Sequence, residues 1–100
     1  MTPRILLAAA LAAIPFAAAS QDNSAARSLA ATCAACHGTD GRSVTKEVVS
    51  LAGLPKEHIA AQMKAFREGS RPATLMHQMA KGYTEQQIDL IAGYFAAQKR

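Results

Sequence analysis

The sequence predicts a small all-α domain, on three observations. Its 100 residues are enough for one domain at most. Residues 25–35, 55–68 and 85–98 are rich in Ala, Gln, Lys, Glu, Met and Leu, which are strong helix formers. The two stretches between them, residues 38–53 and 70–83, do not read as β-hairpins and are predicted to be long loops.

Local start and stop signals justify each helix in chain order. Side chains able to cap the first helix stand at residues 22–24. Pro55 suits the first position of the second helix, which Gly69 should end. Thr84 and Gln87 have the spacing of a capping box at the start of the third. These signals predict three main helices.

Apolar spacing predicts which faces of the helices are buried. Ile59, Met63 and Phe66 recur at i, i+4 and i+7 in the second helix. The third helix repeats the pattern with Ile88, Ile91, Ala92 and Phe95. Residues 44–49 are a weak strand candidate because they are rich in Val. A core this small, with no Trp and much Ala, predicts that a bound group completes it.

The first 20 residues are typical of a secretory signal peptide. Arg4 precedes an apolar run over residues 5–19, small residues follow, and cleavage after Ala19 or Ser20 fits equally. Pro15 interrupts the run, which argues against a stable membrane span. We therefore expect residues 1–20 to be a signal peptide and residues 21–100 to be the exported domain. One of the 11 basic residues is Arg4, so the exported domain keeps ten against seven acidic residues, a formal charge of +3. That is too weak to indicate nucleic-acid binding.

The motif Cys33-Ala34-Ala35-Cys36-His37 contains both cysteines of the chain. A local disulfide is compatible with export, but a thioredoxin-type dithiol would need a βαβ pattern, which the sequence lacks. A structural zinc site needs four ligands, and this motif offers three. Two thiols separated by two residues and followed at once by histidine are typical of covalent attachment of haem c. We therefore predict one haem c, attached to Cys33 and Cys36, with His37 as an iron ligand.

A methionine is the usual second iron ligand in electron-carrying proteins of this kind. Met63 lies on the apolar face of a predicted helix and is expected to fill the core. Met76 and Met79 both lie in the loop before the last helix, and spacing alone does not separate them. His77 is a weaker competitor for the same position.

The sequence resembles the short bacterial class I cytochromes c, most closely the cytochrome subunits of flavocytochrome c sulfide dehydrogenases. The stretches that carry the resemblance are "LAATCAACHGTDG" and "LAGLPKEHIAAQMKAFREGSRPATLMHQMAKGYTEQQIDLIAGYFAAQK". It implies the class I cytochrome c fold, with three main helices and long loops wrapped around one covalently bound haem. In this family the iron-binding methionine stands eight residues before the residue that caps the last helix, which is Met76 here. Relatives usually have a proline, whose carbonyl accepts a hydrogen bond from the ligating histidine, where this chain has Val49.

The resemblance also implies a function. We expect a periplasmic electron-transfer protein with no catalysis by this chain alone, in which an FAD-containing sulfide dehydrogenase subunit donates electrons and a downstream acceptor removes them. A free-standing soluble electron carrier is the alternative within the same class. A haem ligand sensor, in which Met76 is displaced, is the alternative from a different class.

Overall fold

The computed structural model describes the backbone of residues 19–100 and the side chains from residue 24 onward. The predicted signal peptide lies almost wholly outside the described residues and stays a prediction. The helices are α1 (Ala19–Ala31), α2 (Ala34–His37), the 3₁₀ turn η1 (Thr39–Gly41), α3 (Lys56–Glu68), α4 (Met76–Lys81) and α5 (Glu85–Ala96). No strand occurs between residues 19 and 100, and the all-α prediction is confirmed for this part of the chain.

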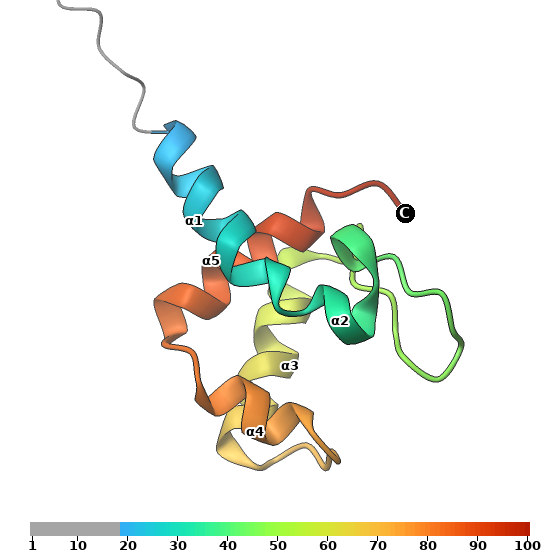
Figure 1. The fold of residues 1–100 in the computed structure, drawn as a ribbon. Coiled ribbons are helices and arrows are strands. Elements are labelled where there is room, and N and C mark those ends of the chain that lie inside the picture. Colours follow the sequence, from blue (N-terminus) through green and yellow to red (C-terminus); the bar gives the residue numbers. More distant parts are fainter. Residues whose placement is uncertain (1–18) are drawn as a thin grey trace, which may run out of the picture.

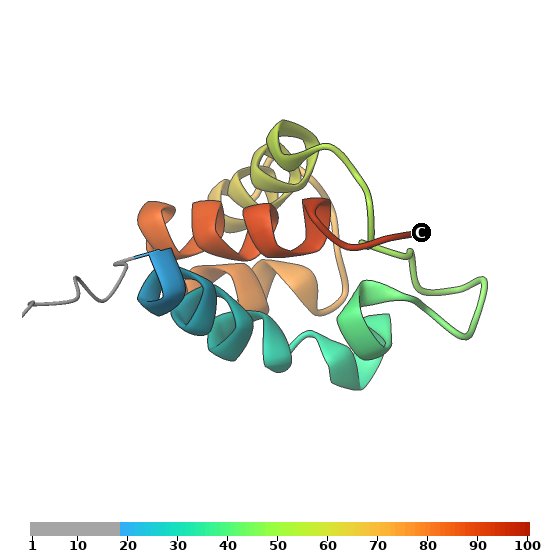
Figure 2. The ribbon, with the colours of Figure 1, turned by 90° about the horizontal axis from the view of Figure 1, so that it is seen from above.

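Helix α5 is the centre of the fold. It packs against α1 on one side and α3 on the other, and α4 packs against α3 (Figures 1 and 2). The buried core residues are Ala30, Ile59, Ala60, Met63, Ala80, Ile88, Ile91, Ala92 and Phe95. Four of these nine residues are alanines, so the helices approach closely but bury little apolar surface of their own.

The predicted limits of α5 and α3 are confirmed within one or two residues. Thr84 accepts a hydrogen bond from the Gln87 backbone, and the Gln87 side chain accepts one from Thr84 N–H, which completes the capping box. Pro55 occupies the N-cap of α3 rather than its first helical position. Gly69 ends α3 in the left-handed conformation with φ 81°, which glycine adopts without the penalty of a Cβ.

Two predictions about the first helix were wrong. Helix α1 starts at Ala19, so residues 22–24 lie within the helix and not ahead of its first turn. The segment predicted as one helix over residues 25–35 is broken: α1 ends at Ala31, and a separate turn, α2, starts at Ala34. Helix α5 ends at Ala96, two residues before its predicted limit, so Lys99 and Arg100 lie beyond its last turn.

The two predicted loops also contain structure that the sequence did not indicate. Helix α4 lies within residues 70–83, and the turn η1 lies within residues 38–53. The strand candidate at residues 44–49 was wrong: no strand pairs with it, and Val44 is 95% exposed. In the described part of the chain, no helix has the length and apolar character needed to cross a membrane.

Candidate functional site

One helical turn brings together the two cysteines and the histidine of the CAACH motif. Cys33 is the N-cap of α2 and His37 is its last residue. The carbonyl of Cys33 accepts hydrogen bonds from the backbone N–H of His37 at 2.9 Å and of Cys36 at 3.3 Å. Cys33 is partly buried, Cys36 is exposed, and both are free thiols. The turn therefore presents two thiols and one imidazole from a single short segment.

The two thiols lie in different environments. Burial is the main cause that raises the pKa of the Cys33 thiol above its ordinary value, and the nearby Cys36 raises it further. A hydrogen bond with Thr32 acts in the opposite direction. Cys33 also packs against the hydrophobic core, whereas Cys36 faces solvent. The fold therefore holds the first thiol in place by packing and leaves the second accessible.

The ring of His37 is oriented by the main chain. Its side chain is 9% exposed, and its Nδ1 lies 2.7 Å from the carbonyl oxygen of Val49. A carbonyl only accepts hydrogen bonds, so Nδ1 carries the proton and donates it. Nε2 then keeps its lone pair, which is the state in which imidazole binds a metal. The Val49 carbonyl thus fills the place of the proline carbonyl that the resemblance implied.

The start of the loop after α2 needs a glycine. Gly38 has φ 85°, and a Cβ built on it would lie 1.8 Å from the carbonyl oxygen of Arg42. The carbonyl of Gly41 accepts hydrogen bonds from the N–H of Leu51 at 2.7 Å and of Ala52 at 3.2 Å. These bonds fold the end of the loop back toward its beginning. Val49 lies two residues before Leu51, so these hydrogen bonds also bring the Val49 carbonyl oxygen close to His37.

Side chains attach the same loop to α5 and to the C-terminal segment. The Tyr94 hydroxyl on α5 donates a hydrogen bond to Asp40 Oδ1 at 2.5 Å. This hydrogen bond is the main cause that raises the pKa of Tyr94 above its ordinary value. Asp40 also lies 3.6 Å from Arg42, whose Nε donates to the carbonyl of Lys99 at 2.9 Å. The loop that supports His37 is therefore fastened to the central helix at a second point.

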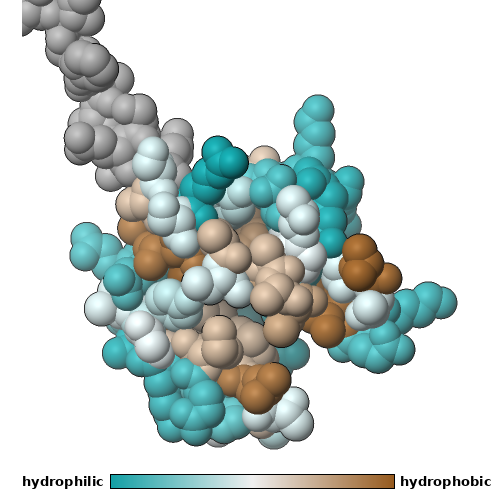
Figure 3. All heavy atoms as spheres, viewed as in Figure 1, coloured by the Kyte–Doolittle hydropathy of each residue, from teal (hydrophilic) through white to brown (hydrophobic). Residues whose placement is uncertain are grey.

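The two candidate methionines differ in burial. Met76 is the first residue of α4, is partly buried and packs against the same core as Cys33. Met79 is 45% exposed. Helices α2 and α4 both border the face turned toward the viewer in Figure 1, and apolar side chains cover the middle of that face in Figure 3. The two helices that border this face carry the thiol and imidazole groups (α2 with its N-cap) and the Met76 thioether (α4), and such a donor set beside apolar surface fits a haem.

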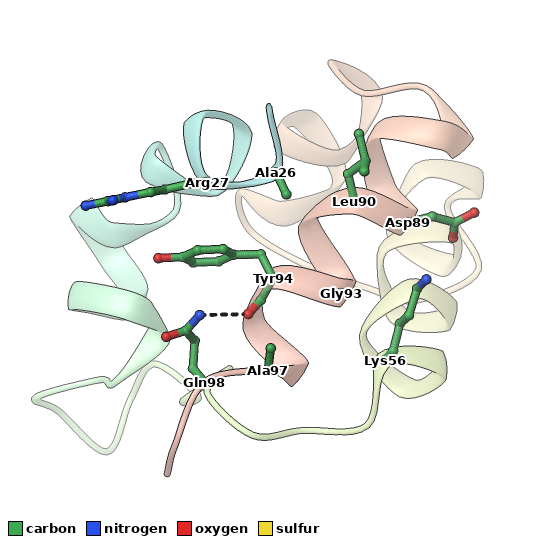
Figure 4. A pocket seen from close by; sticks show the side chains of 9 residues that line it. All are labelled: Ala26, Arg27, Lys56, Asp89, Leu90, Gly93, Tyr94, Ala97 and Gln98. Carbon is green, nitrogen blue, oxygen red and sulfur yellow. Dashed lines mark hydrogen bonds between the residues drawn. The ribbon is translucent and has the colours of Figure 1, made fainter. Parts of the chain in front are cut away.

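A cavity of about 450 Å³ lies between α1 and α5 (Figure 4). It is lined by Ala26, Arg27, Lys56, Asp89, Leu90, Gly93, Tyr94, Ala97 and Gln98. The four predicted site residues do not line it.

The other histidines and three basic residues of the loops lie outside the CAACH turn. His58 is exposed in the first turn of α3, and His77 is partly buried next to Met76. Lys46, Arg71 and Lys81 are exposed. Among the described side chains, no three or more of His, Cys, Asp and Glu converge on one point as metal ligands.

Two features at or near the site, one hydrogen bond and one cavity, were not predicted from the sequence. The bond between Asp40 and Tyr94 joins positions 54 residues apart, and no local pattern marks such a pair. A second cavity lies beside α4 and is lined in part by Arg67 and His77. The spacing of His77 and Lys81 at i and i+4 was the signal that could have indicated a shared face.

Comparisons with known proteins find relatives of this chain. A family model for cytochrome c matches residues 24–99. The cytochrome subunit of sulfide dehydrogenase from Chlorobaculum tepidum is 46% identical over 67 residues, which cover 67% of this chain and 60% of that protein. Cytochrome c-554(548) from Halomonas halodenitrificans is 38% identical over 71 residues, covering 68% of this chain and 86% of that protein.

A longer match runs over almost the whole chain. The thiosulfate dehydrogenase electron acceptor from Thiomonas intermedia is 37% identical over 97 residues, which cover 96% of this chain and 44% of that protein. The matched region is 60% of the length of the Chlorobaculum relative and less than half of the Thiomonas relative. These relatives therefore contain sequence that the match does not reach.

Proposed function

This chain belongs to the cytochrome c family, and from that premise we propose that it is the haem subunit that accepts electrons from an FAD-containing sulfide dehydrogenase subunit in the periplasm. Its cofactor is haem c, and its activity is electron transfer. The observation that carries the proposal is the CAACH turn, with His37 oriented by Val49, in a chain 46% identical over 67 residues to a sulfide dehydrogenase cytochrome subunit. The pattern of residues 1–20 supports export.

We assign the cofactor contacts to four residues. Cys33 and Cys36 would hold the haem through thioether bonds, and His37 Nε2 and the Met76 sulfur would bind its iron. Haem c would supply a one-electron ferric/ferrous couple. Iron bound by two protein side chains would offer no open coordination site to a substrate, which suits an electron carrier.

The chain's own residues provide rigidity around this centre. The Val49 carbonyl fixes the tautomer and the ring plane of His37, and such hydrogen bonds tune the basicity of a ligating imidazole. The backbone bonds from Leu51 and Ala52 to Gly41 hold the loop that presents this carbonyl. Packing of Met76 against the core limits where its sulfur can lie. Ligands held in this way need little rearrangement when the iron changes charge.

Purification from the native source tests the partner. The chain is expected to co-purify with flavin at a constant haem-to-flavin ratio, and sulfide should reduce the haem of the purified complex. As a control, the isolated chain without the flavin subunit should not be reduced by sulfide at the same rate. Haem that purifies alone, with no flavin at any step, would favour a free-standing carrier and overturn the subunit assignment.

Optical spectra test the electron-transfer assignment separately from the partner. A low-spin haem with a methionine-to-iron charge-transfer band is expected in the ferric protein. A high-spin haem that binds carbon monoxide readily would instead indicate a ligand sensor.

A further inference from the structure

A hydrogen bond between two hydroxyl groups joins segments that lie 51 residues apart in the sequence. The Thr32 Oγ1 atom lies 2.7 Å from the hydroxyl oxygen of Tyr83. Thr32 also donates a hydrogen bond to the carbonyl of Leu29 at 3.2 Å, and this uses its only hydroxyl hydrogen. The Tyr83 hydroxyl is therefore the donor in the Thr32–Tyr83 bond, and Thr32 Oγ1 is the acceptor.

The two residues of this bond stand next to the two parts of the candidate haem site. Thr32 lies between α1 and α2 and directly precedes Cys33, whose N–H donates to the carbonyl of Ala30 at 3.0 Å. Tyr83 lies between α4 and α5, and its N–H donates at 3.3 Å to the carbonyl of Ala80, a fully buried residue of α4. The Thr32–Tyr83 bond therefore connects the segment that carries the CAACH turn to the C-terminal end of α4.

The main packing contacts of α4 are with a different helix from those of α2. Helix α2 packs against α1 and η1, whereas α4 packs against α3. Residues 70–75, which lead into α4, form no regular helix, and Leu75 is 67% exposed. Six helical residues span only about 9 Å, so the position of Met76 at the start of α4 depends on how the end of this helix is held.

We propose that Thr32 and Tyr83 are positioning residues for Met76. The inference rests on the proposed function, in which the Met76 sulfur binds the iron. The Thr32–Tyr83 bond holds the end of α4 close to the CAACH segment, and it must break before α4 can swing away and release this sulfur. Loss of one neutral hydrogen bond changes such an equilibrium by about three- to tenfold.

Imidazole binding to the ferric holoprotein measures how often Met76 is released. Imidazole can take the place of the thioether only after its release, so the apparent affinity for imidazole rises in proportion to the released fraction. Tyr83→Phe removes the donor and should raise this affinity about three- to tenfold. Thr32→Val removes the acceptor and should have the same effect.

The two substitutions act on the same bond, which makes their combination informative. The double variant Tyr83→Phe/Thr32→Val should bind imidazole no more than twofold tighter than either single variant, because the bond can be lost only once. Thr32→Ser keeps the hydroxyl group and should retain the affinity of the wild type within about twofold.

Tyr94→Phe is the matched control. It makes the same chemical change in another hydrogen-bonded tyrosine, whose partner is Asp40 on the loop after α2 and not a residue next to α4. Imidazole affinity should therefore stay within about twofold of the wild type. A general loss of stability would raise the affinity in both tyrosine variants, whereas a positioning role raises it in Tyr83→Phe alone.

The results that overturn the inference are distinct from those that overturn the proposed function. Equal imidazole affinities in Tyr83→Phe and the wild type, with the methionine-to-iron charge-transfer band present in both, would end the positioning role and leave the iron ligand assignment intact. An equal rise in Tyr94→Phe would do the same. A wild-type protein without this band would overturn the assignment of Met76 itself, and the positioning role with it.

Discussion

The Nδ1 atom of His37 lies 2.7 Å from the main-chain carbonyl oxygen of Val49, twelve residues away in the sequence. A main-chain acceptor is insensitive to the identity of the side chain that carries it. The valine side chain is 60% exposed, so it adds little packing of its own. The orientation of the imidazole therefore depends on the path of the loop and not on a particular residue at position 49.

Val49→Pro is expected to keep the haem spectrum and the midpoint potential of the wild type. The carbonyl is retained, and the Val49 N–H is not a donor in any main-chain hydrogen bond described for residues 19–100. Proline also restricts the unfolded chain, so the melting temperature should rise, corresponding to about 0.4–1 kcal/mol. Potentiometry and thermal melts of the holoprotein check this, and a changed potential would show that the loop path had moved.

Covalent attachment is the second prediction. Both thiols come from the one CAACH turn and are predicted to form thioether bonds, so haem should remain on the polypeptide after denaturation and acid–acetone extraction. Cys36→Ala should retain at most one thioether and mature poorly. The double variant Cys33→Ala/Cys36→Ala is the control and should release all of its haem. Release from the wild type would end the assignment of Cys33 and Cys36.

The third prediction compares two glycines with similar φ. Gly38 has φ 85° and Gly69 has φ 81°, but a Cβ on Gly38 would meet the Arg42 carbonyl oxygen at 1.8 Å, whereas one on Gly69 would meet nothing within 4 Å. Gly69→Ala should therefore cost only the left-handed conformation, about 1–2 kcal/mol. Gly38→Ala should cost at least twice as much, because the backbone itself must move.

Guanidinium unfolding of the two holoproteins, followed by circular dichroism, measures the difference. Equal free energies of unfolding for the two variants would show that the loop after α2 yields easily. The support of His37 by this loop would then need another explanation.

Local sequence information was sufficient to predict some helices of this fold but not others. The limits of α5 follow from the capping box and from four apolar residues at helical spacing, all within one segment. The six-residue helix α4 is too short to be stable from its own propensity, and packing on α3 stabilises it. For that reason the sequence of residues 70–83 read as a loop.

The candidate site also has a part that one sequence segment predicts and a part that depends on packing between helices. The CAACH motif lies within five consecutive residues and is recognisable in the sequence. The hydrogen bond from His37 to the carbonyl at position 49 was implied by the family resemblance. The cavity beside α4 joins Phe66 and Arg71 to His77, and it exists only because α3 and α4 pack together. No periodicity in a single segment reports such a cavity.

The fourth prediction concerns the bond between Tyr94 and Asp40. Tyr94→Phe removes this hydrogen bond and should lower the free energy of unfolding by about 1 kcal/mol at pH 7. The folded state raises the pKa of Tyr94, so it favours the neutral phenol. This part of the stability is fully present below the unfolded pKa of about 10 and is lost as the pH rises through the folded value.

Urea unfolding from pH 7 to pH 11 should therefore show wild type and Tyr94→Phe converging above about pH 10. Asp40→Asn, which keeps an oxygen acceptor but removes the charge, should lie between them at pH 7. Parallel stability curves over the whole range would show that the phenol does not contribute through this bond.

The last prediction separates Met76 from Met79. A thioether is a neutral, soft donor that favours ferrous iron, and Met76 is the partly buried methionine at the start of α4. Met76→Ala should abolish the methionine charge-transfer band and open a site for carbon monoxide, and Met76→His should stay low-spin with a lowered potential. Met79→Ala should change neither property, because the resemblance to class I cytochromes c assigns the iron ligand to Met76, eight residues before Thr84.

His77 is the internal control for this experiment. If its ring can reach the iron, Met76→Ala will remain low-spin, and adding His77→Ala will make it high-spin. If its ring cannot reach the iron, Met76→Ala alone will be high-spin. If Met79→Ala loses the charge-transfer band and Met76→Ala keeps it, the iron ligand is Met79, three residues further along α4. The assignment of electron transfer would stand in that case.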